Sequence, residues 1–185
     1  PSLPNLLATV AGNLSELKPF SGLKLLDLTL PPAFLTQYQG PQFGIAGTRA
    51  LTGVYDRPII GTIIKPSIGQ TPEATAQQVK ILAEAGIDFI KDDELQSDAP
   101  HCRFNARVTA VQQVLNDHAA RTGKRVMYAA NITGDLDQML ARLAHSEANQ
   151  GTCAMVSMNA IGLAAMKIVR RHSRVGLHGH RNGWG

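Results

Sequence analysis

The chain has 185 residues and a formal net charge of +4; 44% of its residues are hydrophobic and 17% are charged. This length excludes a complete eight-unit β/α barrel, which needs roughly 200 to 250 residues, and the composition supports a packed core rather than disorder. The two cysteines, Cys102 and Cys153, form no CxxC pair. Their arrangement excludes a disulfide-stapled secreted domain and predicts buried thiols in a reducing compartment.

Nucleic acids and membranes are not expected partners. The basic residues are scattered, and their densest cluster, residues 167–174, is typical of a helix end near an anionic ligand. The start of the chain lacks a signal-peptide pattern, and the least charged stretch, residues 153–166, is too short for a span of about 20 residues. These observations predict a soluble cytoplasmic protein. Because the sequence lacks an initial Met and stops inside a promising motif, we also expect a fragment.

The first part of the chain, residues 1–56, has an irregular pattern. Apolar residues at 6, 7 and 10 predict a short helix, and the alternation over residues 26–30 predicts a strand. A proline pair at 31–32 and a glycine-proline pair at 40–41 then interrupt the pattern. We interpret this stretch as a linker between domains or as the tail of one.

From residue 57 onward, short apolar runs alternate with helical patterns. The expected strands are residues 58–64, 87–91, 125–130, 154–158 and 175–178. The expected helices are residues 72–85, 105–120, 136–143 and 163–171. Such alternation indicates parallel strands joined by right-handed crossovers, with both faces of the sheet covered.

Two architectures fit this alternation: an open doubly wound sheet, or the first five strands of a β/α barrel. The loop after the first strand, Lys65 to Gly69, matches neither the GxGxxG fingerprint nor a Walker loop, which disfavours nucleotide binding. Polar residues gather instead at the carboxyl ends of successive strands, as they do in barrel active sites. We therefore expect an α/β fold that is a partial (β/α)8 barrel of about five units.

The second strand ends in one lysine and three acids, residues 91–94. Side chains alternate along a strand, so Lys91 and Asp93 are expected to point the same way, and Glu94 can curl in to join them. Two carboxylates on one side suit a hard divalent cation such as Mg²⁺. Lys91 could become an oxygen ligand if CO₂ converted its amine to a carbamate. A polar strand-to-loop transition, or a simple salt bridge of Lys91, explains the same residues.

The first and fifth strands also end in polar residues. A partly desolvated Lys65 near other cations could have a lowered pKa and act as a base, although a surface lysine is the alternative. His178 and His180 share a face, and with Arg181 they could serve proton transfer and phosphate binding. Their HxH spacing also fits a transition-metal site, and a histidine-rich loop without a role is the remaining interpretation.

Three motifs at these strand ends together resemble the large subunit of ribulose bisphosphate carboxylase (RuBisCO) and the RuBisCO-like proteins. They are GTIIKPSIG at 61–69, GIDFIKDDE at 86–94 and LHGHR at 177–181, with further matches at 10–13, 26–28 and 39–45. The resemblance covers nearly the whole chain. It implies the end of an α+β N-terminal domain, with its linker, over residues 1–50, and an incomplete β/α barrel over residues 51–185.

The resemblance also implies roles in metal binding and proton transfer. Lys91 would be carbamylated and would bind Mg²⁺ together with Asp93 and Glu94. Lys65 would be the base that transfers a proton at the substrate carbon, and His180 would move further protons. By this resemblance the cofactors are Mg²⁺ and the CO₂ of the carbamate.

Three more residues are implied to bind a phosphorylated, sugar-like substrate. Arg181 would hold a phosphate, and His178 would contact the substrate beside it. Asn13 would reach the active site of the neighbouring subunit, which implies a homodimer with shared active sites.

The chain departs from the carboxylating members of the family. Ser67 stands where they have a second lysine, Ile63 and Trp184 replace a threonine and a histidine, and residues 157–159 lack a His-Asp pair. These departures predict a RuBisCO-like protein of the form IV type. It would be an Mg²⁺-dependent enzyme that enolises a phosphorylated ketose or diketose by abstracting a proton next to the carbonyl, with an isomerase, enolase or decarboxylase/transcarboxylase outcome. A genuine ribulose-1,5-bisphosphate carboxylase is the first alternative, and an inactive fragment with a structural role is the second; this fragment alone is expected to be inactive.

Overall fold

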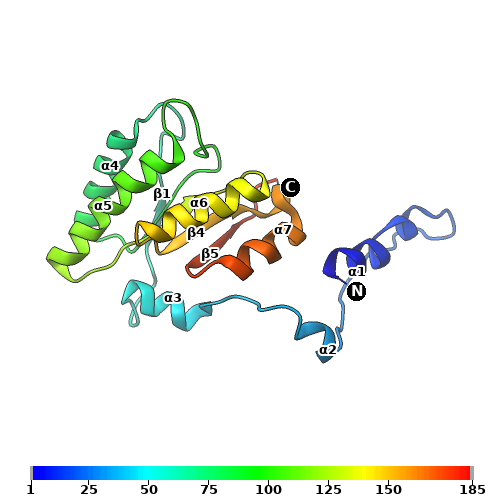
Figure 1. The fold of residues 1–185 in the computed structure, drawn as a ribbon. Helices are drawn as coiled ribbons and strands as arrows, with labels where there is room; N and C mark the ends of the chain where they lie inside the picture. Colours follow the sequence, from blue (N-terminus) through cyan, green and yellow to red (C-terminus); the bar gives the residue numbers. More distant parts are fainter. Residues whose placement is uncertain (1, 184–185) are drawn as a thin grey trace.

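A computed structural model describes residues 2–183 of the chain (Figure 1). Its centre is one parallel sheet of five strands in the order β1-β2-β3-β4-β5. The strands are β1 (Gly61–Ile63), β2 (Phe89–Lys91), β3 (Met127–Asn131), β4 (Cys153–Ser157) and β5 (Gly176–His180). Because each strand pairs with the next one in sequence and the order never reverses, every crossover carries its helix to the same side of the sheet.

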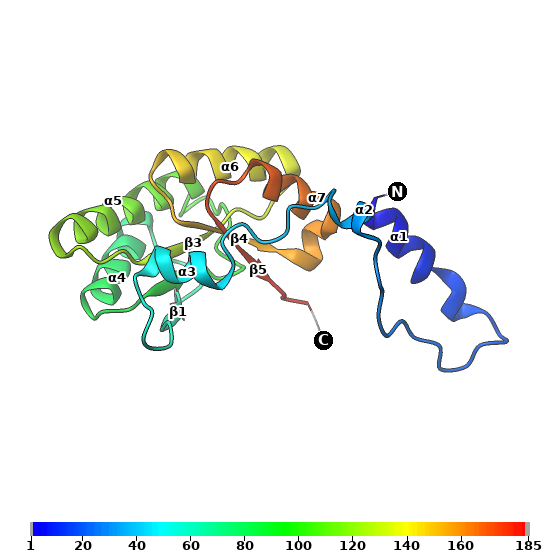
Figure 2. The ribbon, with the colours of Figure 1, turned by 90° about the horizontal axis from the view of Figure 1, so that it is seen from below.

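Four crossover helices cover that side (Figure 2). They are α4 (Pro72–Glu84), α5 (Phe104–Thr122), α6 (Leu136–Ala148) and α7 (Met158–His172). A doubly wound sheet would place helices on both faces, whereas a barrel wall places them all outside. The arrangement therefore confirms the partial β/α barrel and decides between the two architectures that the sequence left open.

Apolar side chains form a separate cluster on each face of the sheet. The larger one joins the outward strand residues Ile90, Tyr128 and Val156 to the four crossover helices. The smaller one lies on the inner face and consists of Met127, Ala129, Cys153 and Met155, with Leu51 and Phe89 packed against it. The period of two along each strand separates the clusters, so that Phe89 and Lys91 face inward while Ile90 faces the helices.

Local signals in the sequence explain several helix boundaries. The Thr71 hydroxyl accepts the Ala74 N–H at 3.2 Å and Pro72 occupies the first turn of α4. Gly86 follows the helix with φ of 90°, a conformation that favours glycine. In α6, Asp135 and Gln138 form a capping box.

The chain before the sheet contains α1 (Leu3–Val10), the 3-10 helix η1 (Asn13–Glu16), α2 (Pro32–Leu35) and α3 (Gly44–Thr52). Both views show α1 and η1 projecting away from the sheet (Figures 1 and 2). The strand expected at 26–30 is wrong: this segment is irregular and Leu26 is 82% exposed. An alternating sequence becomes a strand only where a neighbour accepts its backbone hydrogen bonds, and this segment has none among residues 2–183.

The bounds of several other elements also differ from expectation, most clearly those of β1 and α7. The buried strand expected at 58–64 is reduced to β1, and Ile60 is 55% exposed, because β1 has a partner on one side only. The helix expected at 163–171 begins earlier, at Met158, and is interrupted at Gly162, whose φ of 71° lies in the left-handed region. Cys102 and Cys153 are free and buried, as expected.

The basic cluster at 167–174 contacts the linker. The Arg170 Nε donates to the Gly40 carbonyl at 2.8 Å, and the Lys167 ammonium lies 4.4 Å from the centre of the Tyr38 ring. These contacts fix the segment before α3 against α7. Within residues 2–183, no helix has the length and apolar character needed to cross a membrane.

A buried carboxylate ties together the amino ends of the first two strands. Arg57 binds both oxygens of the fully buried Asp88, at 2.6 and 2.8 Å. The Ile60 N–H donates to the same carboxylate at 2.9 Å, and Lys124 lies 2.9 Å from it. The Arg57 hydrogen bonds, more than the others, hold the pKa of Asp88 far below its usual range despite its burial.

Candidate active site

The polar residues singled out from the sequence meet at the carboxyl ends of β1, β2 and β5. Lys65 follows β1, Lys91 is the last residue of β2, and His180 is the last residue of β5. Parallel strands end at the same edge of a barrel wall, which is where β/α barrels carry their active sites. The contacts described below connect all three strand ends.

Lys91 points to the inner face of the sheet and is half-buried. Its Nζ donates to the Asp92 carbonyl at 2.9 Å and lies 3.6 Å from the Met155 sulfur. Burial lowers the pKa of Lys91, although the nearby Glu94 and Asp93 carboxylates act in the opposite direction. The site therefore favours the neutral amine more than water does, and the neutral amine is the form that reacts with CO₂.

Asp93 is paired with Lys65. The Lys65 Nζ donates to Asp93 Oδ2 at 2.5 Å and to the Ser67 hydroxyl at 2.9 Å, while the Leu95 N–H donates to Asp93 Oδ1 at 3.0 Å. Burial alone would raise the pKa of Asp93, but the hydrogen bonds from Lys65 and Leu95 outweigh it and lower the pKa. Lys65 is less desolvated than expected: 58% of its side chain is exposed, and its nearest partner is a carboxylate.

The histidines of β5 approach the same acids. His180 Nε2 lies 3.2 Å from Glu94 Oε2, and the rings of His178 and His180 are 6.4 Å apart. His178 also lies 5.6 Å from the Phe89 ring on the inner face of β2. Burial, together with the charges of Lys91 and His180, lowers the pKa of His178. The acids, the lysines and the histidines thus form one polar cluster.

Two of the substrate-binding candidates lie outside this cluster. Arg181 follows β5 and is exposed. Asn13 begins η1, which projects away from the sheet, so the structure does not bring it to the strand ends of the same chain (Figure 1). The substitution at Trp184 lies outside the described residues.

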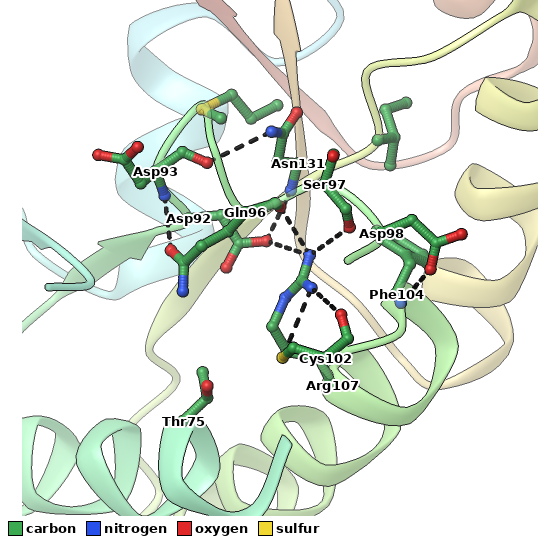
Figure 3. A network of polar contacts seen from close by, with 12 residues as sticks. Thr75, Asp92, Asp93, Gln96, Ser97, Asp98, Cys102, Phe104, Arg107 and Asn131 are labelled. Carbon is green, nitrogen blue, oxygen red and sulfur yellow. Dashed lines mark hydrogen bonds and ion pairs between the residues drawn. The ribbon is translucent and has the colours of Figure 1, made fainter. Parts of the chain in front are cut away.

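Sequence reasoning missed a buried polar network under the acidic loop (Figure 3). The network consists of four fully buried residues, in which Arg107, Tyr128 and Asn131 each donate a hydrogen bond to Asp92. One signal was present in the sequence: Arg107 falls on the same helical face as Val108 and Val111, an apolar stripe where a charged residue needs a buried partner.

The polar cluster supplies some, but not all, of the ligands that a hard divalent cation needs. Asp93 and Glu94 supply carboxylate oxygens, which are the ligands that Mg²⁺ prefers. Within residues 2–183, no three His, Cys, Asp or Glu side chains stand close enough together to hold an ion. Lys91 would therefore have to supply a further oxygen, and its lowered pKa is compatible with conversion of the amine to a carbamate.

The fold and the strand-end cluster define a β/α-barrel protein of the RuBisCO type, and comparison with known proteins agrees. Residues 44–185 match the family "Ribulose bisphosphate carboxylase large chain, catalytic domain", and residues 1–34 match the N-terminal domain of the same large chain. The chain belongs to the ribulose bisphosphate carboxylase large-chain family.

Relatives named as enzymes are similar over 98% or more of this chain. A 3-oxo-isoapionate-4-phosphate transcarboxylase/hydrolase of Xanthobacter autotrophicus is 60% identical over 185 residues, which are 100% of this chain and 45% of the relative. A 3-oxo-isoapionate-4-phosphate decarboxylase of Rhizobium etli is 44% identical, over 98% of this chain and 44% of the relative. The chain thus spans less than half the length of these relatives.

Among solved structures, a rubisco-like protein from Burkholderia fungorum superposes with a TM-score of 0.95 at 47% identity. The superposition covers 99% of this chain and 45% of that one. The five-strand wall is therefore the same substructure that the longer protein contains.

Proposed function

We propose that the complete protein is a RuBisCO-like enzyme that cleaves the carboxyl group from 3-oxo-isoapionate 4-phosphate, or transfers that group. The observation that carries the proposal is the convergence of five polar residues at the carboxyl ends of β1, β2 and β5: Lys65, Lys91, Asp93, Glu94 and His180. The substrate is chosen from the names of the relatives that are 60% and 44% identical to this chain. Loss of the carboxyl group from such a substrate forms an enolate, the same kind of intermediate that the proton abstraction expected from the sequence would form.

The substrate named for these relatives is a phosphorylated 3-oxo acid. Breaking the bond between its carboxyl carbon and the neighbouring carbon leaves the electron pair on that carbon, where the 3-oxo group accepts it as an enolate. The enolate then takes up one proton, and the carboxyl group leaves as CO₂ or passes to an acceptor. An enzyme for this reaction has to stabilise negative charge on oxygen and to deliver a proton to carbon.

Asp93, Glu94 and a carbamylated Lys91 would hold Mg²⁺ at the end of β2. When bound, the cation would act as a Lewis acid that stabilises the negative charge developing on the substrate oxygens. The buried surroundings of Lys91 and Asp93 support this assignment, because electrostatic interactions are stronger where water is excluded.

Lys65 and His180 are the proposed proton-transfer groups. The Lys65 side chain is 58% exposed while its Nζ remains hydrogen-bonded to Asp93 and Ser67, so its position is fixed and the side chain remains accessible. His180 is oriented by Glu94 at 3.2 Å. Each group can add a proton to the enolate or remove one in the reverse direction.

Phosphate binding and assembly complete the proposal. Arg181, next to the two histidines, would bind the substrate phosphate through its planar fork of donors. Asn13 would serve the site of a second subunit in a homodimer, which is consistent with its position on a projecting segment.

Ser67 separates this proposal from carboxylation of ribulose bisphosphate. A serine cannot supply the positive charge that a lysine would place against incoming CO₂ and the nascent carboxylate. Loss of one such charge-assisted contact costs about 2.7 to 4 kcal/mol of transition-state stabilisation, or roughly 10² to 10³ in rate. Lys65 itself is retained, so proton transfer at carbon should survive.

The test uses the full-length protein with Mg²⁺ and bicarbonate in D₂O. We expect consumption of 3-oxo-isoapionate 4-phosphate, release of its carboxyl group, and one deuterium on the carbon that carried it. We expect no incorporation of ¹⁴CO₂ into ribulose bisphosphate. Fixation of ¹⁴CO₂ without consumption of the 3-oxo acid would show instead that the protein is a genuine carboxylase.

A further inference from the structure

The loop that carries Asp93 and Glu94 is held from the side opposite the candidate active site. Asp92, between Lys91 and Asp93, points the other way and is fully buried in the layer between sheet and helices. Its carboxylate accepts the Tyr128 hydroxyl at 2.6 Å and the Asn131 N–H at 2.9 Å, and Arg107 donates to it at 3.0 Å. Asp92 therefore anchors the end of β2 to β3 and α5.

Arg107 connects this anchor to the rest of the loop. One terminal nitrogen of its guanidinium donates to Asp92 and to the carbonyls of Gln96 and Ser97, at 3.0, 2.9 and 3.1 Å. The other donates to the Cys102 carbonyl at 3.2 Å. Figure 3 shows the guanidinium at the centre of these groups, enclosed by the loop. A single side chain, 1% exposed, thus fixes both ends of the turn that follows the acids.

Asn131, at the end of β3, holds the first half of the same loop. Its side-chain amide donates to the Asp93 carbonyl at 3.3 Å and to the Glu94 carbonyl at 3.1 Å. The Gln96 side chain accepts the Asp93 N–H at 2.8 Å. The backbone of both acids is therefore attached to buried groups, while their carboxylates face Lys65 and His180.

Stability alone is a poor explanation for this network. A buried arginine–aspartate pair gains little over well-packed apolar side chains, because removing both charges from water is costly. The guanidinium also bonds three backbone carbonyls of one loop, and apolar side chains would leave these without partners. The network is better explained as a set of contacts that fixes the conformation of the loop carrying Asp93 and Glu94.

We propose that Arg107 and Asn131, anchored on Asp92, are positioning residues that hold the backbone of Asp93 and Glu94 in a preformed arrangement for cation binding. The inference rests on the proposed function only for the identity of the cation. The preformed loop itself is a property of the free protein and can be measured without metal.

The chain contains a matched control at the other end of β2. Arg57 binds the buried Asp88 through two hydrogen bonds, but this pair lies at the amino end of the strand and contacts no residue of the 92–98 loop. Arg57→Lys and Arg107→Lys both keep the positive charge and lose the planar fork of donors. A general loss of stability would affect both variants, whereas a positioning role belongs to Arg107 alone.

The experiment compares the full-length protein with Arg107→Lys and Arg57→Lys. Amide hydrogen exchange without metal should become about tenfold faster or more in segment 93–102 of Arg107→Lys, and remain unchanged there in Arg57→Lys. Calorimetric titration with Mg²⁺ in bicarbonate should show affinity weakened about 10- to 100-fold in Arg107→Lys only. Equal loop exchange in both variants would overturn the proposal.

A second variant covers the case in which Arg107→Lys does not fold. Asn131→Leu keeps a similar branched shape and removes the amide bonds to the Asp93 and Glu94 carbonyls, together with the bond that the Asn131 oxygen accepts from the Thr133 N–H at 3.1 Å. We expect faster exchange of the same segment, and unchanged exchange would refute the proposal. Absence of Mg²⁺ binding in the unmodified protein would contradict the proposed function, while the exchange measurements would still decide the positioning role.

Discussion

Replacing Tyr128 with phenylalanine should destabilise the protein through the loss of one hydroxyl group. Tyr128 is fully buried on β3, and its hydroxyl donates to Asp92 Oδ1 at 2.6 Å. Arg107 and Asn131 both donate to the other oxygen, Oδ2, so among residues 2–183 the Tyr128 hydroxyl is the donor to Oδ1. Tyr128→Phe keeps the ring in place and leaves a buried carboxylate oxygen without its donor.

The size of the effect follows from the charge on the acceptor. A hydrogen bond to an ionised group contributes about 1.5 to 3 kcal/mol net, and an unpaired buried acceptor retains its full desolvation penalty. We therefore expect the free energy of unfolding to fall by about 1.5 to 3 kcal/mol, measured by urea denaturation of the full-length protein.

Tyr55→Phe is the control, because Tyr55 is 67% exposed and its hydroxyl is accessible to water. Its free energy of unfolding should remain within about 0.5 kcal/mol of the unmodified protein. A loss below about 0.5 kcal/mol in Tyr128→Phe would show that the buried Asp92 carboxylate is not stabilised by the Tyr128 hydroxyl.

Three further predictions concern proton transfer, pH and thiol reactivity. Lys65→Ala should abolish the enzyme-catalysed exchange of the α-proton of the phosphorylated ketose product with D₂O; undiminished exchange would assign the proton transfer to another group, with His180 the next candidate. The pKa of Asp88 in the folded protein lies below its value of about 3.9 in the unfolded chain. Its contribution to stability is therefore present above the unfolded-state pKa and is lost as the pH falls toward the folded-state pKa. The melting temperature should therefore decrease as the pH is lowered below about 4, and the decrease should be smaller in Asp88→Asn. Identical dependence of the melting temperature on pH in the two proteins would contradict this prediction. Burial raises the pKa of the Cys153 thiol to about 12, so at pH 8 it should react with a thiol reagent only after unfolding, and rapid labelling of the folded protein would disprove its burial.

The fold was largely predictable because its signals are local and repeated. Alternating apolar runs and helical stripes predicted each strand and crossover helix, and Thr71 with Pro72 predicted where α4 begins. Residues 26–30 misled the interpretation, since alternation does not reveal whether a neighbouring strand exists. The break at Gly162 was also missed, because a glycine inside an apolar stripe does not reveal its own φ.

The sequence predicted only those residues of the candidate site that lie at the ends of the strands. Alternation along β2 was sufficient to separate Lys91 and Asp93 from Asp92. The partners of Asp92 could not be inferred, because Arg107 lies on a helix and its contact depends on how that helix packs. The pairing of Lys65 with Asp93 likewise joins residues from two strand ends, and their separation is set by the barrel wall rather than by spacing in the sequence.

A carbamate on Lys91 would complete the cation site that we propose at the end of β2. The decisive measurement is calorimetric titration of the full-length protein and of Lys91→Met with Mg²⁺, each with and without bicarbonate. We expect binding that requires bicarbonate, strengthens as the pH rises because only the neutral amine reacts, and is absent in Lys91→Met. Equal Mg²⁺ affinity in the variant and the unmodified protein would show that Lys91 does not contribute to the site.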